Sequence, residues 1–313
     1  MKNNIKQPEK TMFNSFNNSM KSRFGCKIYK LTLSGGMTCP TRDGTLGTKG
    51  CIFCSAKGSG DFAAKPCEDI ATQLANAKQL ISRKAKDAKY IAYFQDYTNT
   101  YAPVDKLRYL FAEAIKPDDI VALSVATRPD CLPDDVIELL SELNNTKPVF
   151  IELGLQTIHE STAEYIRRGY KLDVFEDAVT RLKASGVEVI AHVIIGLPYE
   201  TEEMIYDTVR YLADIKIDGI KLQLLHVLEG TDLADEYKQG KFDVLTMDKY
   251  IDILENCVRL LPPETIIHRL TGDGAKKDLI APLWSADKKN VLNTINKRFK
   301  EHNVVQGSLY NNV

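Results

Sequence analysis

Three cysteines lie close together in the sequence, with a spacing that indicates metal ligation. Cys39 is followed by eleven residues, Cys51, two residues and Cys54. Close-set cysteines in a reducing compartment indicate a metal site or catalysis more often than disulfides. Structural zinc usually has four ligands in two close pairs, and only one pair is present here. Three thiolates suit a 4Fe–4S cluster with one iron open to a ligand that is not protein. The alternatives are structural zinc completed by a remote side chain and a chance spacing of the cysteines.

The composition indicates a globular protein in a reducing compartment. The chain has 313 residues, 44% of them hydrophobic, and 41 basic side chains balance 42 acidic ones. These values exclude disorder of the whole chain and a collagen-like protein. No apolar run approaches the length of a membrane span, and the N-terminus does not resemble a signal peptide, so we expect a cytoplasmic protein. The other four cysteines are expected to be small buried hydrophobes: Cys26, Cys67, Cys131 and Cys257.

Short apolar runs that alternate with helical periodicity predict the fold. Six runs rich in β-branched residues span 26–33, 89–94, 119–126, 148–155, 188–197 and 219–228. Amphipathic segments, expected to be helices, span 68–88, 133–145, 172–186, 201–215, 247–261 and 288–303. This alternation predicts parallel strands with right-handed crossovers, as in a partial or full β/α (TIM-like) barrel or a doubly wound sheet. A possible last strand lies at 265–272 within a C-terminal helical extension.

A long glycine-rich connection separates the first strand from the first helix. It spans 34–60 and contains the three clustered cysteines. Such loops have a median of about 4–6 residues, and in β/α barrels they build the active-site face. We therefore expect a basic N-terminal segment (1–25), a β/α core (26–230) that carries this cluster loop, and an extension (231–313) packed on the core. Two basic runs, within 1–30 and 288–300, suit a nucleic-acid partner or a solvated surface.

The cysteine loop, with Phe53 just before the third cysteine, resembles that of the radical SAM superfamily. The usual spacing there is three residues and then two, whereas eleven and then two resembles the Elongator-like branch, in particular the YtqA/YhcC type, whose YtqA form is also called MnmL. The resemblance covers nearly the whole chain. It rests on FGCKIYKLTLSGGMTCPTRDGT, CIFCSAKGSGDFA, KYIAYFQDYTNTYAP, ATRPDCLPD, IELGLQTIHESTAEYIRRG, HVIIGLP, GIKLQLLHVLEGT, IHRLTGD and IAPLW.

This resemblance implies two cofactors, a 4Fe–4S cluster held by Cys39, Cys51 and Cys54, and S-adenosylmethionine (SAM) bound at its open iron. SAM is then cleaved to a 5′-deoxyadenosyl radical. The resemblance also implies SAM contacts, with Gln95 in the place of a Gly-Gly-Glu segment, Gln156 after a G-x-Q strand end and Arg168 twelve residues later at the SAM carboxylate. The remaining members of the expected cofactor set are Phe53 and His192.

One expected SAM contact is missing, and the substrate residues are less defined. The Elongator-like branch has a glutamate where this chain has Ala126, so Thr127 or Arg128 is expected to compensate. Four polar residues fall near predicted carboxyl ends of strands and could face a substrate or form structural bridges: Arg128, Asp130, Lys221 and His226. No local pattern identifies a catalytic acid, a catalytic base or a radical quencher.

The Elongator-like branch modifies C5 of the wobble uridine in tRNA. The YtqA type implies conversion of 5-carboxymethylaminomethyl-uridine to 5-aminomethyl-uridine, and the segment GSGDFA favours this type over YhcC. The expected partners are tRNA, a flavodoxin or ferredoxin as electron donor, and a downstream tRNA methylase. The alternatives are a YhcC-type enzyme that acts on another RNA, a small molecule or a peptide, and a non-catalytic metal-binding tRNA adaptor.

Overall fold

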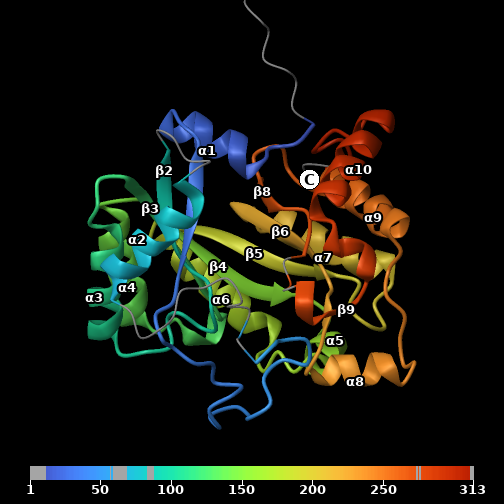
Figure 1. Ribbon diagram of the computed structural model, residues 1–313, viewed down its shortest axis with the longest axis horizontal. Coiled ribbons are helices and arrows are strands. Elements are labelled where there is room, and N and C mark those ends of the chain that lie inside the picture. The colour runs from blue at the N-terminus through green and yellow to red at the C-terminus, as the bar shows by residue number, and fades with distance from the viewer. Residues whose placement is uncertain are drawn as a thin grey trace, which may run out of the picture.

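The computed structural model describes residues 12–56, 58, 69–82, 88–272, 274 and 276–310. Its centre is a parallel sheet of seven strands that curls into an open barrel (Figure 1). In spatial order the strands are β1 (Ile28–Leu33), β2 (Lys89–Phe94), β3 (Ile120–Thr127), β4 (Val149–Gln156), β5 (Glu188–Ile195), β6 (Gly219–Leu224) and β8 (Ile266–Arg269). Each of the six predicted strands and the possible last strand is present. Because β1 and β8 are the edges of this sheet, the fold is the partial form of the predicted barrel.

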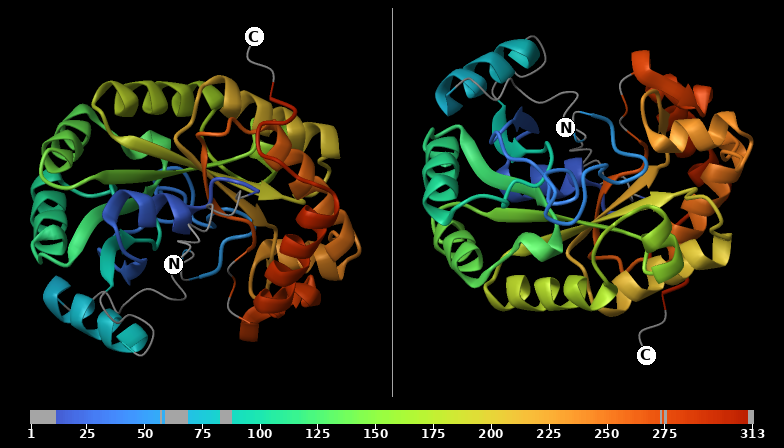
Figure 2. Two further views of the ribbon diagram at one scale, coloured as in Figure 1. Left: turned by 90° about the horizontal axis from the view of Figure 1, so that it is seen from above. Right: turned by 90° about the horizontal axis from the view of Figure 1, so that it is seen from below.

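Helices cover the outside of the sheet, and Figure 2 shows them as an outer layer around its curve. Their leucine, isoleucine, valine and phenylalanine side chains pack against the outer face of the sheet. Together with the side chains of that face they form one large hydrophobic core. The helices of this layer are α2 (Ile70–Ile81), α3 (Val104–Ile115), α4 (Asp134–Asn144), α6 (Leu172–Ala184), α7 (Glu202–Asp214), α9 (Met247–Leu260) and α10 (Lys288–Glu301). Thr201 and Thr246 are the N-caps of α7 and α9. The side chain of each accepts a hydrogen bond from the backbone amide of the third helical residue, Met204 and Lys249 respectively.

The apolar run 219–228 is not one strand, as the sequence predicts, but two. β6 ends at Leu224, and the chain turns before β7 (Val227–Leu228), which pairs antiparallel with β9 (Leu279–Ala281) in a separate small sheet. Hydrophobicity alone cannot locate this break, because the residues on both sides of it are buried. The turn places His226 between the two sheets, beside Gly272 and Gly274, where a Cβ on either glycine would meet the imidazole ring.

The described part of the basic N-terminal segment forms a plug rather than a free arm. Helix α1 (Phe16–Phe24) lies across the amino ends of the strands, opposite the cluster loop (Figures 1 and 2). Met20 is its buried residue, and it packs with Phe150 and Ile91 inside the barrel. Phe13, just before α1, contacts Phe299 of α10 edge-to-face with ring centroids 6.0 Å apart. Residues 1–11 of the predicted segment lie outside the described part.

Candidate active site

The carboxyl ends of the strands open into one pocket that gathers nearly all the residues singled out in the sequence. Asp130 is the exception, because it lines a neighbouring groove and forms a bidentate ion pair with Arg128 at 2.9 and 2.7 Å. Polar groups from separate loops converge here, as expected of the active-site face of a β/α barrel. The predicted residues that line the pocket are Cys39, Cys51, Phe53, Cys54, Gln95, Arg128, Gln156, Arg168, His192, Lys221 and His226, together with Ala126 and Thr127.

Backbone hydrogen bonds fix the cluster loop to two helices at the pocket wall. The Ile52 amide donates to the carbonyl of Ile166, just after α5 (Glu160–Tyr165), at 3.2 Å. The Leu233 amide of α8 (Asp232–Lys238) donates to the Ile52 carbonyl at 3.1 Å. Ile52 also belongs to a second apolar core that includes Ile166 and Leu233. These contacts hold Cys51 and Cys54 at the mouth of the barrel.

Arg42 joins the two arms of the cluster loop. One terminal nitrogen of its guanidinium donates to the carbonyls of Cys54 and Ser55, at 2.9 and 2.8 Å. The arm that carries Cys39 is thereby tied to the arm that carries Cys54, across the eleven residues of the first spacer. Gly50 makes this crossing possible, because it adopts φ +73° and a Cβ there would lie 2.7 Å from the Arg42 guanidinium. The sequence gives no sign of this role beyond an arginine within the spacer.

Replacing Arg42 with Met should reduce the amount of iron that the protein binds. The variant keeps an apolar stem but loses both carbonyl contacts, so the two arms would no longer be held at a fixed separation. We expect iron bound per chain after anaerobic reconstitution to fall several-fold, measured by metal analysis and by cluster absorbance. Lys49→Met, which removes an exposed cation from the same loop, is the matched control. Equal iron content in the two variants would contradict the role assigned to Arg42.

The three cysteine side chains line one pocket, as ligands of a common metal centre must. Tetrahedral zinc with Zn–S bonds of about 2.3 Å would bring its sulfur ligands within about 4 Å of one another. No group of three cysteine, histidine or carboxylate side chains in the described ranges is arranged to hold a metal ion in that way. The three cysteines nevertheless line one pocket, and burial, followed by the nearby Cys54, raises the pKa of the Cys51 thiol to about 12. This raised pKa favours the neutral thiol, so a cationic metal centre is needed to hold the three cysteines together as thiolates.

The end of β4 has the features of a ligand site. Gln156 adopts φ +65°, which is uncommon for a residue with a side chain, and a register shift separates it from Gly154. Its Oε1 is buried and accepts no hydrogen bond from the described residues. A Cβ at Gly154 would lie 2.9 Å from the Gln156 amide nitrogen. An orphaned amide oxygen on a strained residue in a pocket indicates a position prepared for a ligand donor, such as the amino group of SAM.

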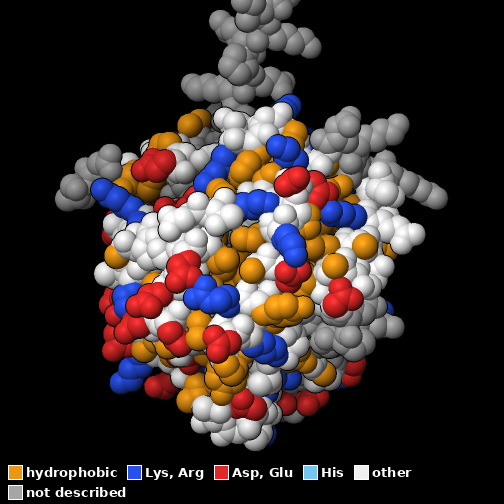
Figure 3. All heavy atoms as spheres, turned by 90° about the vertical axis from the view of Figure 1, so that its left-hand side faces the viewer, with side chains coloured by type: hydrophobic (Ala, Val, Ile, Leu, Met, Phe, Trp, Pro, Cys, Tyr) orange, Lys and Arg blue, Asp and Glu red, His pale blue; other side chains and the backbone are white. Residues whose placement is uncertain are grey.

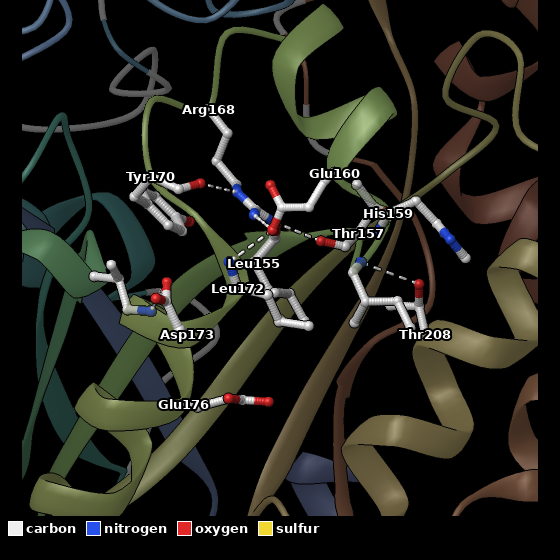
Figure 4. Close-up of polar contacts among 12 residues, drawn as sticks. Leu155, Thr157, His159, Glu160, Arg168, Tyr170, Leu172, Asp173, Glu176 and Thr208 are labelled. Carbon is white, nitrogen blue, oxygen red and sulfur yellow. Dashed lines mark hydrogen bonds and ion pairs between the residues drawn. The ribbon is translucent and has the colours of Figure 1, made fainter.

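Arg168 is almost completely buried, with 2% of its surface exposed, and its guanidinium contacts the turn after β4 (Figure 4). It donates to the carbonyls of Leu155 at 3.2 Å, Thr157 at 2.6 Å and Tyr170 at 3.0 Å. Glu160 lies 3.3 Å from its remaining terminal nitrogen. These hydrogen bonds fix the backbone on either side of Gln156, at the wall of the pocket. A direct contact with the SAM carboxylate stays a prediction.

A polar layer lies at the base of the pocket, with one side chain from each of six adjacent strands. Four of its members form the floor of the pocket: Tyr93, Glu152, His192 and Lys221. At the centre of the layer is Glu152 of β4, which is fully buried. One carboxylate oxygen accepts from Ser124 at 2.9 Å and contacts Lys30. The other accepts from Tyr93 at 2.7 Å and also contacts Lys221. The ring nitrogen Nε2 of His192 lies 3.0 Å from this second oxygen. Tyr93 pairs directly with Ser124, and His192 pairs directly with Lys221. The other neighbouring members of the layer are offset by two residues in the strand register, which keeps all six side chains at one level.

Burial and charge set the protonation states in this layer. Burial acts to raise the pKa of Glu152, but the ammonium groups of Lys221 and Lys30 outweigh it and hold that pKa well below its ordinary value. Burial lowers the pKa of His192 to about 4, with Lys221 acting in the same direction. His192 is therefore neutral near pH 7, and its bond to the carboxylate makes Nε2 the donor. Its expected contact with SAM would then use Nδ1, an acceptor.

Sequence reasoning missed Lys30, Tyr93 and Ser124 as members of this layer. Each lies inside a strand that is otherwise apolar. A buried lysine or serine is costly without a partner, so such interruptions are a signal of a polar interior. The partners could not be assigned from the sequence, because they depend on the stagger of the strands.

Comparison with known proteins agrees with this geometry. The profile of the radical SAM superfamily matches residues 44–212, and the profile of the radical SAM C-terminal domain matches residues 217–301. The chain belongs to the radical SAM superfamily. It is therefore an enzyme of this superfamily, whose members use a 4Fe–4S cluster and SAM. When bound, these groups supply a carbon-centred radical that removes a hydrogen atom from a substrate.

The predicted YtqA/YhcC type is also confirmed. The chain is 44% identical to YtqA of Bacillus subtilis over 298 residues, which cover 95% of this chain and 92% of that protein. YhcC of Escherichia coli is 37% identical over 298 residues, with 95% of each chain covered. The higher identity agrees with the preference for YtqA based on GSGDFA, although most of that segment lies outside the described residues.

The Elongator-like resemblance has support in both sequence and fold. A tRNA uridine(34) acetyltransferase of Methanocaldococcus jannaschii is 29% identical over 156 residues, which cover 49% of this chain and 28% of that protein. The solved structure of Elp3 from Methanocaldococcus infernus superposes with a TM-score of 0.65 and 19% identity. That match covers 76% of this chain and 60% of the other, so it shows a shared fold.

Proposed function

We propose that this enzyme converts 5-carboxymethylaminomethyl-uridine to 5-aminomethyl-uridine at the wobble position of tRNA. The bond that breaks joins the side-chain nitrogen to the carboxymethyl carbon. That carbon loses two electrons, takes its oxygen from water and leaves as glyoxylate, while the electrons reduce SAM to methionine and 5′-deoxyadenosine. A flavodoxin or ferredoxin would supply the priming electron, and a tRNA methylase would act on the product. We further assign SAM contacts to Phe53, Gln95, Gln156, Arg168 and His192.

The observation that carries the proposal is the shared pocket. The cysteine loop, the strained Gln156 and a cationic floor at Lys221 all line one opening. The floor suits a substrate whose reacting arm carries a carboxylate. The relatedness to YtqA and to a tRNA uridine(34) acetyltransferase supports the choice of a wobble uridine.

The rim of the pocket face offers an aromatic side chain for an unpaired base. Tyr199 lies in the loop between β5 and α7, has φ +68° and is 66% exposed. Its ring packs against Tyr165 of α5, with centroids 5.3 Å apart, and the Tyr165 hydroxyl donates to Glu236 at 2.6 Å. The next residue, Glu200, accepts from Thr157 at 2.5 Å, which anchors the loop. RNA-binding proteins commonly stack unpaired bases on such aromatic rings.

Other surfaces fit an RNA contact near the pocket less well. Helix α1 and the end of α10 that packs beside it lie towards the amino ends of the strands, away from the cluster loop. Figure 3 shows the side of the molecule that carries α3 and α4, where acidic and basic side chains are interspersed with apolar ones. A continuous basic surface is not seen on the described part of that side.

Tyr199→Ala should weaken tRNA binding. Loss of one stacked base costs about 1–3 kcal/mol, which is roughly a fivefold to hundredfold rise in Kd. Binding of the modified tRNA at a fixed, physiological salt concentration is the measurement. Tyr109→Ala is a matched control, because Tyr109 is also 66% exposed but lies on α3, on the outer layer. Tyr199→Phe should retain binding. The role fails if Tyr199→Ala and Tyr109→Ala bind equally well.

The proposal is tested by nucleoside analysis of tRNA after incubation with the reconstituted enzyme, SAM and a reductant. We expect 5-carboxymethylaminomethyl-uridine to be replaced by 5-aminomethyl-uridine in equal amount, with one glyoxylate formed per conversion. SAM cleavage that leaves the nucleoside unchanged would contradict the proposed substrate and favour a small-molecule or peptide substrate. RNA binding without any SAM cleavage would indicate an adaptor.

A further inference from the structure

We propose that Lys221, on the floor of the pocket, binds the carboxylate of the substrate's carboxymethylaminomethyl arm. This inference rests on the proposed function and adds to it the residue that distinguishes substrate from product. Lys221 would be a binding residue that acts on the anionic end of the arm, away from the bond that breaks.

The position of Lys221 suits a ligand contact. It lies in the middle of β6, lines the pocket and is only 3% exposed. Its Nζ contacts Glu152 and donates to the Tyr93 hydroxyl at 3.1 Å. An ammonium group has three donors, so one remains beyond these two contacts with described residues. An ion pair made at such a buried position is screened little by water or salt.

The surrounding layer fixes the lysine in place. Glu152 receives hydrogen bonds from Ser124 and Tyr93 as well as from Lys221, so its carboxylate cannot swing away. The Nζ of Lys221 also lies over the Tyr93 ring, 5.0 Å from its centroid. A side chain held by these contacts binds without losing much conformational entropy, which favours affinity.

The charges in this layer favour an anion. Lys30 and Lys221 share the single carboxylate of Glu152, and His192 beside them is neutral. The two ammonium groups thus exceed the carboxylate by one positive charge when both are protonated. The substrate arm ends in a carboxylate, whereas the product arm ends in an amine that is cationic near neutral pH. The same lysine would attract the carboxylate of the substrate and repel the ammonium group of the product. This repulsion would increase the difference in affinity between the two tRNAs.

Protonation of Lys221 links this binding to pH. Burial lowers the pKa of the Lys221 ammonium to about 7, while Glu152 acts to raise it. The other groups that face it are Lys30, Arg269, His192 and His268, and burial lowers the pKa of both histidines, which keeps them neutral near pH 7. An anionic ligand favours the charged form, so substrate affinity should fall as the pH rises above about 7 in the wild type. Arginine stays charged across this range, so Lys221→Arg should flatten the pH profile.

The test compares Lys221→Met with Lys30→Met in the full-length, reconstituted protein. Both variants remove an ammonium group from Glu152, but Lys30 does not line the pocket. We expect the KM for tRNA carrying the carboxymethyl group to rise about tenfold to a hundredfold in Lys221→Met. Lys30→Met should raise the KM by a clearly smaller factor, because it removes one positive charge from the layer but no donor that lines the pocket. The Kd for SAM should stay within threefold of wild type in both. The preference for substrate tRNA over product tRNA should disappear in Lys221→Met alone.

Other outcomes separate this inference from the function it rests on. If the wild type does not convert the tRNA, the proposed function has failed. If the wild type converts it but Lys221→Met keeps the KM and the substrate preference, the role of Lys221 is wrong. A rise in the Kd for SAM that matches the rise in KM would show that the lysine serves the cofactor. If Lys221→Met does not fold, Lys221→Arg decides through its pH profile, and a wild-type profile in that variant overturns the inference.

Discussion

Replacing Cys39, Cys51 or Cys54 with Ala should abolish SAM cleavage while leaving the barrel folded. Each variant would remove one of three cluster ligands, and a cluster held by two thiolates is not expected to survive reconstitution. Activity should fall at least a thousandfold, a loss of about 4 kcal/mol or more in transition-state stabilisation. The fold should persist, because these cysteines are only partly buried and belong to the loop outside the sheet. The measurements are cluster absorbance, formation of 5′-deoxyadenosine and circular dichroism.

The control for these variants is Cys131→Ala. Cys131 is buried and its side chain lies 3.8 Å from Asp130, at the neighbouring groove. Cys131→Ala should keep the cluster and most of the SAM cleavage, and thermal denaturation measures its stability. Full cluster absorbance in any of the three loop variants would show that its cysteine is not a ligand. Loss of the cluster in Cys131→Ala alone would point to a different ligand set.

Glu152→Gln should cause the largest loss of stability of any single substitution in the pocket floor. The carboxylate compensates the buried ammonium group of Lys221 and the partly buried one of Lys30, and an amide would leave both without a counterion. Breaking a buried ion pair by removing one partner costs about 3–5 kcal/mol. The midpoint of urea denaturation of the apoprotein is the measurement. We expect a clear shift to lower urea concentration together with weaker retention of SAM, since the layer lies directly below the pocket.

A matched carboxylate on the surface serves as the control for Glu152. Glu142 pairs with Arg108 on the outer helices and is more than half exposed, so Glu142→Gln should shift the denaturation midpoint far less than Glu152→Gln. Lys221→Met placed in the Glu152→Gln background should recover part of the lost stability, because one uncompensated charge is removed. A denaturation midpoint in Glu152→Gln equal to that of Glu142→Gln would mean that the floor does not depend on this carboxylate.

The sequence predicts most of the sheet, because strands buried on both faces have continuous apolar runs. Runs such as 89–94 and 148–155 match β2 and β4 almost residue for residue. It does not predict α1, whose composition is polar and whose buried residue is Met20 alone. It also does not reveal the break between β6 and β7, since both pieces are buried and only the turn at Leu225 and His226 separates them.

The candidate site also has residues that the sequence predicts and contacts that it does not. The three cysteines and Gln156 stand out by their type and spacing, and the structure brings them to one pocket. The bridge made by Arg42 and the partners of Glu152 depend on contacts between residues distant in the sequence, which no local pattern encodes. Arg168 shows a third case, because its position in the motif is predicted while its contacts with backbone carbonyls are visible only in the fold.

Radical SAM chemistry on this tRNA is tested most directly by anaerobic reconstitution of the protein with iron and sulfide. Dithionite, SAM and tRNA carrying 5-carboxymethylaminomethyl-uridine are then added. We expect a brown protein with cluster absorbance that forms 5′-deoxyadenosine, faster with this tRNA than with tRNA that already carries the aminomethyl group. A colourless protein that binds zinc and leaves SAM intact would contradict this expectation.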